Sequence, residues 1–458
     1  MSIRTIAKLL SLALLGVAYS AAEQSAGPTP ATFNKDVAPI LYKNCVVCHH
    51  ANDIAPMSLV TFKDVRPWAA AVREAVVKRT MPPWHADPNV GEYINDPRLS
   101  DADIATIVAW VKDGAKEGDP SQLPAAPEFH EGWHITPDEI ISIPGTVIEA
   151  GNRDDYEYIY VPTNFTEDKW VHAAEVMPGD RRVVHHATVS VVSADAVPKM
   201  REDHAKADQG EDQYHYRTGK VLHLRPDAPV ADDGCSTPEG GGLPGKQSGY
   251  LNHVPAIYLP GHLAETRPDG YALKIAAGSY LQFQVHYSNR LAEAVKDRTS
   301  IGLVYAKEPV KHEVAQYEIW NFLFKIPPQD GGHRVTSCYV LPKDVMAVGY
   351  TAHMHYRGKS MQTEAIYPDG RREIIFNVPK YDFRWQETYF LKHQYVLPKG
   401  TKLMTTAYFD NSANNPLNPD PSKTIRFGEP SEEEMMGFWL AFADIKQDDK
   451  DVVAQNQQ

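Results

Sequence analysis

The spacing of hydrophobic residues changes once along this chain, at about residue 115. From Thr32 to about Ala115 apolar residues recur at helical intervals. After Ser100, which with Asp103 has the spacing of a capping box, four of them would share one helix face: Ile104, Ile107, Val108 and Val111. Gly114 is a typical stop signal. Residues 30–115 therefore predict a small α-helical domain.

The next stretch, residues 116–134, shows little periodicity and contains three prolines, Pro120, Pro124 and Pro127. This composition is typical of a linker. An extended linker of this kind reaches roughly 3 Å per residue, so we expect it to let the helical domain approach the rest of the chain.

Beyond the linker, hydrophobic and polar residues alternate with a period of two, which predicts strands. The clearest are Tyr156–Val161, Lys169–Val176, Tyr280–Tyr287 and Val345–Tyr356. Many short strands, turns such as Pro368–Gly370 and no strong helix predict a mainly β fold of antiparallel sandwiches. The length suits two successive sandwiches, which we place at residues 135–310 and 311–450.

The first 22 residues have the pattern of a signal peptide. Arg4 and Lys8 precede a short apolar run, Leu9–Ala18, and Ser20 and Ala22 supply small residues for cleavage. That run is about half of a membrane span, and we expect no membrane span later in the chain. The formal net charge of −13 argues against nucleic acid or an anionic membrane as a partner. We expect a bacterial protein that is periplasmic or secreted.

Cys45, Cys48 and His49 form a C-x-x-C-H box. Two thiols one helical turn apart can form thioethers to one haem, and His49 can then bind the iron. A thioredoxin-like redox pair would expect a βαβ context and has no use for the histidine. Together with the export signal, the box predicts a covalently bound haem c.

This first domain resembles the small cytochromes c. Met81, within Arg79–Trp84, is the expected second axial ligand, and His50 and His85 are the alternatives. The two other cysteines, Cys235 and Cys338, are either bonded to each other or free.

Three histidine groups stand on the predicted strands: His185 with His186, His286, and His353 with His355. Residues i and i+2 of a strand face the same side, so His353 and His355 can bind one ion together. His185 and His186 would face opposite sides of an ideal strand, and they can share a metal only where the strand twists or bulges. Imidazole alone suits zinc, copper, iron or nickel.

Two adjacent methionines, Met435 and Met436, help to choose the metal. A thioether prefers copper(I) to zinc, although two such methionines taken alone more often fill a core. Isolated strand histidines are usually ordinary surface or core residues, and we interpret five in that way: His172, His204, His215, His223 and His262.

From about Pro137 to Asp444 the chain resembles the copper type II, ascorbate-dependent monooxygenases, the family of peptidylglycine α-hydroxylating and dopamine β-monooxygenases. The resemblance lies in the order of four motifs: Val-His-His, Gln-Val-His-Tyr, a His-x-His that follows a cysteine-containing strand, and Glu-Glu-Met. It implies two jelly-roll-like sandwiches that face each other across a wet cleft, each with one copper ion.

The resemblance also implies the ligands. His185, His186 and His286 match those of the electron-storing copper. His353, His355 and Met435 match those of the copper at which dioxygen is activated, which makes them the expected catalytic residues. Met436 would be a core residue.

The chain departs from the family at the substrate site. Where the peptide hydroxylase has an arginine, an asparagine and a tyrosine that hold its substrate, this chain has Thr351, Gly437 and Trp439. The carboxylate anchor is absent, so peptide amidation is not expected. An apolar or aromatic substrate suits Phe438 and Trp439 better. Cys338 matches a family cysteine whose usual partner lies near the C-terminus, where this chain has none.

These observations predict a copper-dependent monooxygenase that hydroxylates an activated C–H bond of a small organic substrate. The reaction would be RH + O₂ + 2 e⁻ + 2 H⁺ → ROH + H₂O. Electrons would enter through the haem from ascorbate or another cytochrome. The alternatives are a non-catalytic haem and copper protein for electron transfer or copper binding, and a zinc-bearing binding module.

Overall fold

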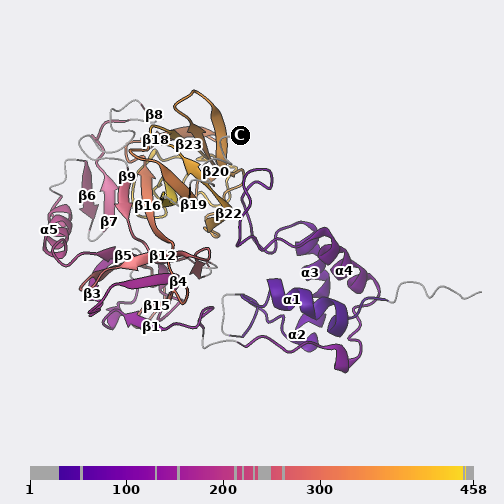
Figure 1. The fold of residues 1–458 in the computed structure, drawn as a ribbon. Helices are drawn as coiled ribbons and strands as arrows, with labels where there is room; N and C mark the ends of the chain where they lie inside the picture. Colours follow the sequence, from indigo (N-terminus) through magenta and orange to yellow (C-terminus); the bar gives the residue numbers. More distant parts are fainter. Residues whose placement is uncertain are drawn as a thin grey trace, which may run out of the picture.

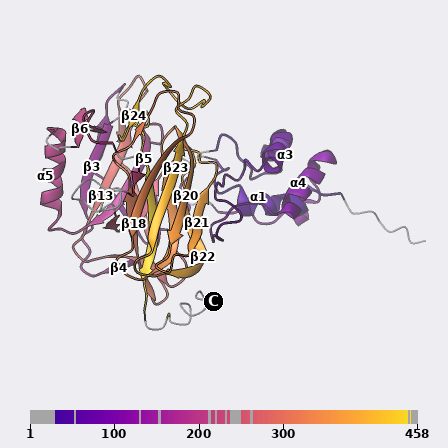
Figure 2. The same ribbon diagram turned by 90° about the horizontal axis from the view of Figure 1, so that it is seen from above.

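The computed structural model describes residues 30–51, 55–128, 132–151, 155–210, 214–218, 221–230, 233–235, 249–259, 262, 264–446 and 449. The predicted signal peptide, residues 1–22, lies outside the described residues. A small helical unit stands beside a larger β-rich body (Figures 1 and 2). No helix among the described residues is long and apolar enough to cross a membrane.

The helical unit is formed by short helices around one core. Its elements are η1 (Phe33–Val37), α1 (Ala38–Asn44), α2 (Phe62–Val65), η2 (Arg66–Trp68), α3 (Ala69–Val77), α4 (Asp101–Lys112) and η3 (Pro120–Gln122). As predicted, Ser100 caps α4, where its Oγ accepts a hydrogen bond from the backbone N–H of Asp103 at 3.1 Å. Gly114 follows with a φ of +93°, which favours glycine. Phe33, Ile107 and Trp110 are fully buried.

The β body contains three larger sheets. The ten-stranded sheet runs β1 (Glu139–Ser142), β15 (Ser300–Tyr305), β4 (Lys169–Met177), β12 (Tyr271–Ile275), β16 (His312–Trp320), β25 (Gly437–Asp444), β19 (Val345–His353), β22 (Thr388–Leu397), with β11 (Glu265–Thr266) on β4 and β9 (Gly249–Asn252) on β16. The four-stranded sheet runs β10 (Ala256–Tyr258), β5 (Val184–Val192), β13 (Tyr280–Tyr287), β3 (Asp155–Pro162). The five-stranded sheet runs β21 (Arg372–Val378), β20 (Gly358–Ile366), β23 (Lys402–Phe409), β18 (His333–Val340), β8 (Asp233–Gly234).

Three two-stranded sheets complete the body: β14 (Val295–Asp297) with β2 (Thr146–Ile148), β17 (Lys325–Ile326) with β24 (Ile425–Arg426), and β6 (His215–Thr218) with β7 (Val221–Leu224). The mainly β class is therefore confirmed. The strands predicted over 156–161, 169–176 and 280–287 correspond to β3, β4 and β13. The predicted turn at Pro368–Gly370 joins β20 to β21.

The two larger hydrophobic cores of the β body lie one in each half. The first draws residues from β4, β12 and β15 on one side and from β5 and β13 on the other, among them Val171, Ile301 and Phe283. The second draws residues from β16, β19 and β25 and from the five-stranded sheet, among them Phe438 and Phe409. The short parallel pairing of β12 with β16, over two residue pairs, joins both halves in one sheet.

Two elements differ from the prediction. β19 ends at His353, so His355 lies beyond the strand and not on it as expected. A helix that the sequence analysis missed, α5 (Val197–Asp208), follows β5. Its only buried residue is Val197, so it lacks the apolar stripe that makes a helix visible in sequence. The structure also joins Cys235 and Cys338 by a disulfide, with a Cα separation of 4.9 Å.

Candidate metal centres and haem site

The first histidine group brings together His185, His186 and His286. Their ligand atoms all lie within 4.8 Å of one another. The Nδ1 atom of His186 lies 3.3 Å from Nδ1 of His185 and 3.3 Å from Nδ1 of His286. Three imidazole nitrogens that converge in this way are a donor set suited to copper or zinc.

A β-bulge makes this convergence possible. In the pairing of β5 with β13, His186 is opposite His286 and Val184 is opposite Tyr287, so the register shifts and His185 is the extra residue. A bulge places two residues opposite one and redirects the side chain of the extra residue. His185 and His186 therefore reach the same point, although an ideal strand would separate them.

Two tyrosines on β3, in the same sheet as β5 and β13, link the first group to Glu429 in the other half of the β body. The ring of Tyr156, on β3, stacks on His286 with the ring centroids 4.2 Å apart. Its hydroxyl donates a hydrogen bond of 2.6 Å to the backbone carbonyl of Glu429. The buried Glu429 carboxylate also accepts from the Tyr158 hydroxyl at 2.5 Å. Glu429 precedes Met435 in the chain, so the first group is tied to the segment that carries the methionine.

The second group consists of His353, His355 and Met435. The Nε2 atom of His353 lies 3.3 Å from the Met435 sulfur, and the two imidazole rings lie with their centroids 5.2 Å apart. The Nδ1 of His353 lies 2.6 Å from the side-chain oxygen of Gln386, so it donates there and leaves Nε2 as the basic nitrogen. The Nδ1 of His355 lies 3.4 Å from the Glu433 carbonyl.

Glu434 organises the backbone of the second group. One of its carboxylate oxygens accepts from the backbone N–H of His355 at 2.8 Å and of Met435 at 3.2 Å, and the other accepts from Arg357 at 2.6 Å. Because Glu434 is fully buried, these bonds replace its hydration. Burial still raises its pKa to about 8. Met436, next to Met435, is fully buried in the core.

Burial favours the neutral form of three of these histidines, His186, His353 and His355. It lowers the pKa of His353 to about 4, against the hydrogen bond to Gln386. It also holds the pKa of His186 and of His355 well below the usual range, and in both cases neighbouring imidazoles add to the effect. A neutral imidazole is the form that binds a metal.

A single aromatic ring touches both groups. Phe383 stacks against His185 with centroids 5.9 Å apart, and its ring lies 5.8 Å from that of His355. Phe383 belongs to the loop between β21 and β22, which also carries Gln386. This loop therefore contacts one histidine of the first group and both histidines of the second.

An aromatic wall flanks His353. The rings of Trp320, on β16, and of Trp439, on β25, have their centroids 6.1 Å and 5.9 Å from that of His353 and 4.8 Å from each other. Trp320, His353 and Trp439 are each partly exposed. Phe438, which we expected beside a substrate, is instead fully buried in the second core. Neighbouring strand residues point to opposite faces, so only Trp439 of this pair reaches the site.

The C-x-x-C-H box follows α1 in a helical turn, where the backbone N–H of His49 donates to the Cys45 carbonyl at 2.9 Å. This turn places Cys45 and His49 about one turn apart on one side. The Nδ1 of His49 lies 3.2 Å from the Met57 carbonyl. A haem-binding histidine typically donates its second ring N–H in this way, so these residues fit a haem. Burial raises the pKa of the Cys45 thiol to about 12, the opposite of what a reactive redox thiol needs.

The three candidates for the second axial position have different surroundings. Met81 lies after α3 and is 37% exposed. The Nδ1 of His50 lies 2.9 Å from the Val46 carbonyl, one turn earlier. Burial lowers the pKa of His85, while Asp382 and the Trp385 carbonyl beside its ring act in the opposite direction. His85 therefore lies against the β body.

A family model of known proteins matches the C-terminal part of the chain. Residues 325–453 match the family model of the copper type II ascorbate-dependent monooxygenase C-terminal domain. This range contains His353, His355 and Met435. The matched residues make up less than a third of the chain, so the similarity concerns this C-terminal part. The matched domain is that of monooxygenases that depend on copper and ascorbate.

The other comparisons add no argument. No curated protein matches the chain. Two viral structures resemble it slightly. The major capsid protein P2 from bacteriophage PM2 has 7% identity and a TM-score of 0.22, with 66% of this chain and 99% of that chain covered. A chain of broad bean stain virus has 6% identity and a TM-score of 0.23, with 68% and 92% covered.

The five histidines interpreted as ordinary residues lie outside the metal-ligand group that the described residues form. His262 is the most unusual, because it is buried between the carboxylates of Glu265 and Glu387 at 3.7 Å and 3.6 Å. Sequence reasoning did not find Gln386, Phe383 or Trp320 as neighbours of the centres. Each lies far along the chain from the ligand that it contacts, so no local motif marks it.

Proposed function

We propose that this protein is an exported copper-dependent monooxygenase that hydroxylates a C–H bond of a small organic substrate, with electrons entering through a covalently bound haem c. The observation that carries the proposal is the pair of convergent donor sets in one β body, three imidazoles in the first and two imidazoles with a thioether in the second. Only one of them contains a thioether, at 3.3 Å from His353 Nε2. The matched family is copper-dependent, which agrees with these donors.

In this proposal His185, His186 and His286 hold one copper ion and His353, His355 and Met435 hold the other. Three imidazoles bind both copper(I) and copper(II), whereas the softer thioether favours copper(I). Bound copper would supply one-electron chemistry at both sites and dioxygen activation at the second. Gln386 fixes the tautomer of His353 so that Nε2 faces the metal position, and Glu434 fixes the backbone that carries His355 and Met435.

The aromatic wall of Trp320 and Trp439 is the proposed substrate surface. It lies beside His353, and its two indole rings are partly exposed. Such a surface favours a neutral apolar or aromatic substrate that packs against an indole face. Thr351, which replaces the family's arginine, is buried and bonded to Thr388, so it offers no cation to a carboxylate.

In this proposal Cys45, Cys48, His49 and Met81 would hold the haem. It would supply single electrons. The net reaction, RH + O₂ + 2 e⁻ + 2 H⁺ → ROH + H₂O, then needs two electron deliveries.

The deciding experiment is a screen of small aromatic and apolar C–H substrates with copper-loaded, haem-loaded protein, ascorbate and ¹⁸O₂. Incorporation of one ¹⁸O atom per product is the expected result. Trp320→Ala should raise KM about tenfold and leave kcat less affected, because it removes packing surface and no ligand. Met435→Ala should abolish hydroxylation. Two metals per chain without substrate-dependent oxygen uptake would instead indicate an electron-transfer or copper-binding protein.

A further inference from the structure

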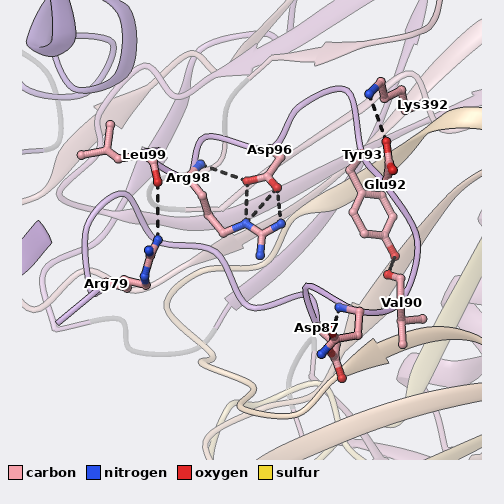
Figure 3. Close-up of polar contacts among 10 residues, drawn as sticks. Arg79, Asp87, Val90, Glu92, Tyr93, Asp96, Arg98, Leu99 and Lys392 are labelled. Atoms are coloured by element: carbon pink, nitrogen blue, oxygen red, sulfur yellow. Dashed lines mark hydrogen bonds and ion pairs between the residues drawn. The ribbon is translucent and has the colours of Figure 1, made fainter. Parts of the chain in front are cut away.

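The helical unit is attached to the β body by an extended strap, residues 81–95, that leaves it between α3 and α4 (Figure 1). The strap pairs with β22, the last strand of the ten-stranded sheet. Tyr93 is bridged to Leu391, the Ile94 N–H donates to the Phe390 carbonyl at 2.9 Å, and the backbone N–H of Lys392 donates to the Glu92 carbonyl at 2.8 Å. Figure 3 shows Glu92 facing Lys392, with their charged groups 3.0 Å apart. The strap thus covers a sheet edge that would otherwise expose unpaired backbone groups.

The strap also contributes to the core of the β body. Tyr93 and Ala86 are buried in the second core, and Trp84 packs against it. The Trp84 ring lies 4.7 Å from the Tyr389 ring and 5.8 Å from the Tyr93 ring. Asp87 makes two hydrogen bonds with Asn377. Its backbone N–H donates to the Asn377 carbonyl at 2.9 Å, and its carboxylate accepts from the Asn377 side-chain amide at 2.8 Å. The contact between the strap and the β body therefore combines apolar packing with hydrogen bonds.

The strap connects the region of the predicted haem ligand to the second histidine group in a few steps. Met81 is three residues from Trp84, and His85 lies beside Trp385. One residue on from Trp385, Gln386 contacts His353 at 2.6 Å. The carbonyl of Gln386 accepts from His262 at 2.7 Å, which holds this segment from the other side.

A second contact joins the helical unit to β4 of the β body. His134 bridges the Val47 carbonyl, inside the C-x-x-C-H box, to the buried Glu175 of β4, at 3.0 Å and 2.6 Å. β4 belongs to the sheet opposite β5 and β13, and the first core lies between them. Two packed sheets are separated by about 10 Å, so a route through His134 must still cross a core layer to reach His186.

We propose that the strap is the electron-entry contact of this protein, and that electrons from the haem reach the site of His353, His355 and Met435 first. This inference rests on the proposed function. The step is haem Fe(II) + Cu(II) → haem Fe(III) + Cu(I), with no proton or bond change. Electron transfer slows steeply with distance; the path from the strap reaches His353 through contacting residues, whereas the path through His134 must also cross the first core. Phe383, which touches both His355 and His185, provides the path by which an electron then reaches the first group.

The test follows one electron in the complete protein without oxygen. A photoreduced flavin reduces the haem in protein loaded with haem and Cu(II), and haem reoxidation is followed at its visible band while freeze-quench EPR counts Cu(II). Trp84→Leu should slow reoxidation at least tenfold, whereas Trp84→Tyr should restore most of the rate. Trp68→Leu is the matched control, because Trp68 lies on η2 and is 45% exposed. It should leave the rate unchanged.

Variants of the two metal sites test which site accepts the electron first. His286→Ala should keep the fast reoxidation, and His353→Ala should remove it. Hydrogen exchange reports docking independently of turnover, so the amides of Ile94 and Lys392 should exchange faster in Trp84→Leu. An unchanged reoxidation rate in Trp84→Leu would overturn the proposal, as would a loss confined to His286→Ala or to His134→Gln. Absence of haem, copper or hydroxylation in the unaltered protein would instead refute the proposed function.

Discussion

At the scale of single residues, the second centre depends on side chains that bind no metal. Glu434 accepts hydrogen bonds from three backbone N–H groups around His355, Arg357 and Met435. A glutamine has one acceptor oxygen, so it leaves at least one of these buried donors unsatisfied and places an amide N–H against them. Loss of such a supporting residue typically weakens metal binding by 10–100-fold.

We therefore expect Glu434→Gln to lower copper affinity at the second centre by about tenfold or more. Competition titration with a copper(I) chelator measures this effect. Glu432→Gln is the matched control, because its side chain is exposed and only its carbonyl is used, by Arg357. Equal affinity in both variants would show that the Glu434 bonds do not position the ligands.

The residues around His262 predict a pH dependence of stability. Burial disfavours its imidazolium, but the carboxylates of Glu387 and Glu265 outweigh burial and raise the pKa of His262 to about 9. The folded protein therefore binds this proton more tightly than the unfolded chain, whose histidine titrates near 6.5. Its contribution is complete below pH 6.5 and is lost as pH rises through about 9, by at most about 1.4 kcal/mol per pH unit.

Glu387 acts in the same direction at lower pH, because burial raises its pKa to about 7 against the effect of His262. In His262→Gln, the free energy of unfolding should fall by about 3 kcal/mol near pH 7, since two buried carboxylates lose their cation. The decline between pH 7 and 9 should become shallower. Urea unfolding over this pH range measures both effects, and the exposed His393 gives the control variant His393→Gln. A slope equal to that of the unaltered protein would contradict the assignment.

At the scale of elements, a bulge and a strand end build the two centres. The bulge in β5 turns His185 toward His186, and the end of β19 at His353 lets the chain turn so that His355 and Met435 can approach. The two ligand sets share no residue. His286→Ala should therefore reduce bound copper from two ions to one per chain and leave the methionine-containing centre loaded.

Elemental analysis and X-ray absorption at the copper edge test this prediction, because the sulfur ligand should remain visible. His172→Ala, on β4 of the same half, is the control and should retain two copper ions. Loss of both ions from His286→Ala would mean that the centres are coupled through the Phe383 loop. Stoichiometric zinc in protein grown with copper would reject the copper assignment.

At the scale of the whole molecule, the helical unit is held at two points, by His134 on β4 and by the strap on β22. Held in this way, the haem that we propose on Cys45 and Cys48 would serve the proposed copper centres without diffusion of a separate protein. Reduced haem should be reoxidised by oxygen quickly in copper-loaded protein and at least tenfold more slowly after copper removal. Stopped-flow spectroscopy measures both rates.

Met81→Ala is the matching test of the haem itself. The haem should stay attached through its thioethers, while the sulfur-to-iron charge-transfer band disappears and the potential falls. If the spectrum does not change, the second axial ligand is His50 or His85. Equal oxidation rates with and without copper would show that haem and copper work independently.

Local sequence determined much of this protein. A capped apolar helix after Ser100, alternating strands such as Tyr280–Tyr287, and the C-x-x-C-H box are short-range patterns, and their physical meaning depends on neighbours within a few residues. The histidine motifs and Met435 also stand out as local groups, because pairs of metal ligands are uncommon by chance.

Only the tertiary structure decided how these groups meet. His185 joins His186 through a bulge that strand pairing with β13 imposes. Gln386, Phe383 and Trp320 reach the centres from strands and loops distant in sequence, and Cys235 finds Cys338 across 103 residues. The sequence pattern assigns residues 81–95 to the helical domain, whereas in the folded protein this strap pairs with β22. Such contacts depend on which sheet edges and faces remain to be covered, and that is a property of the whole packed chain.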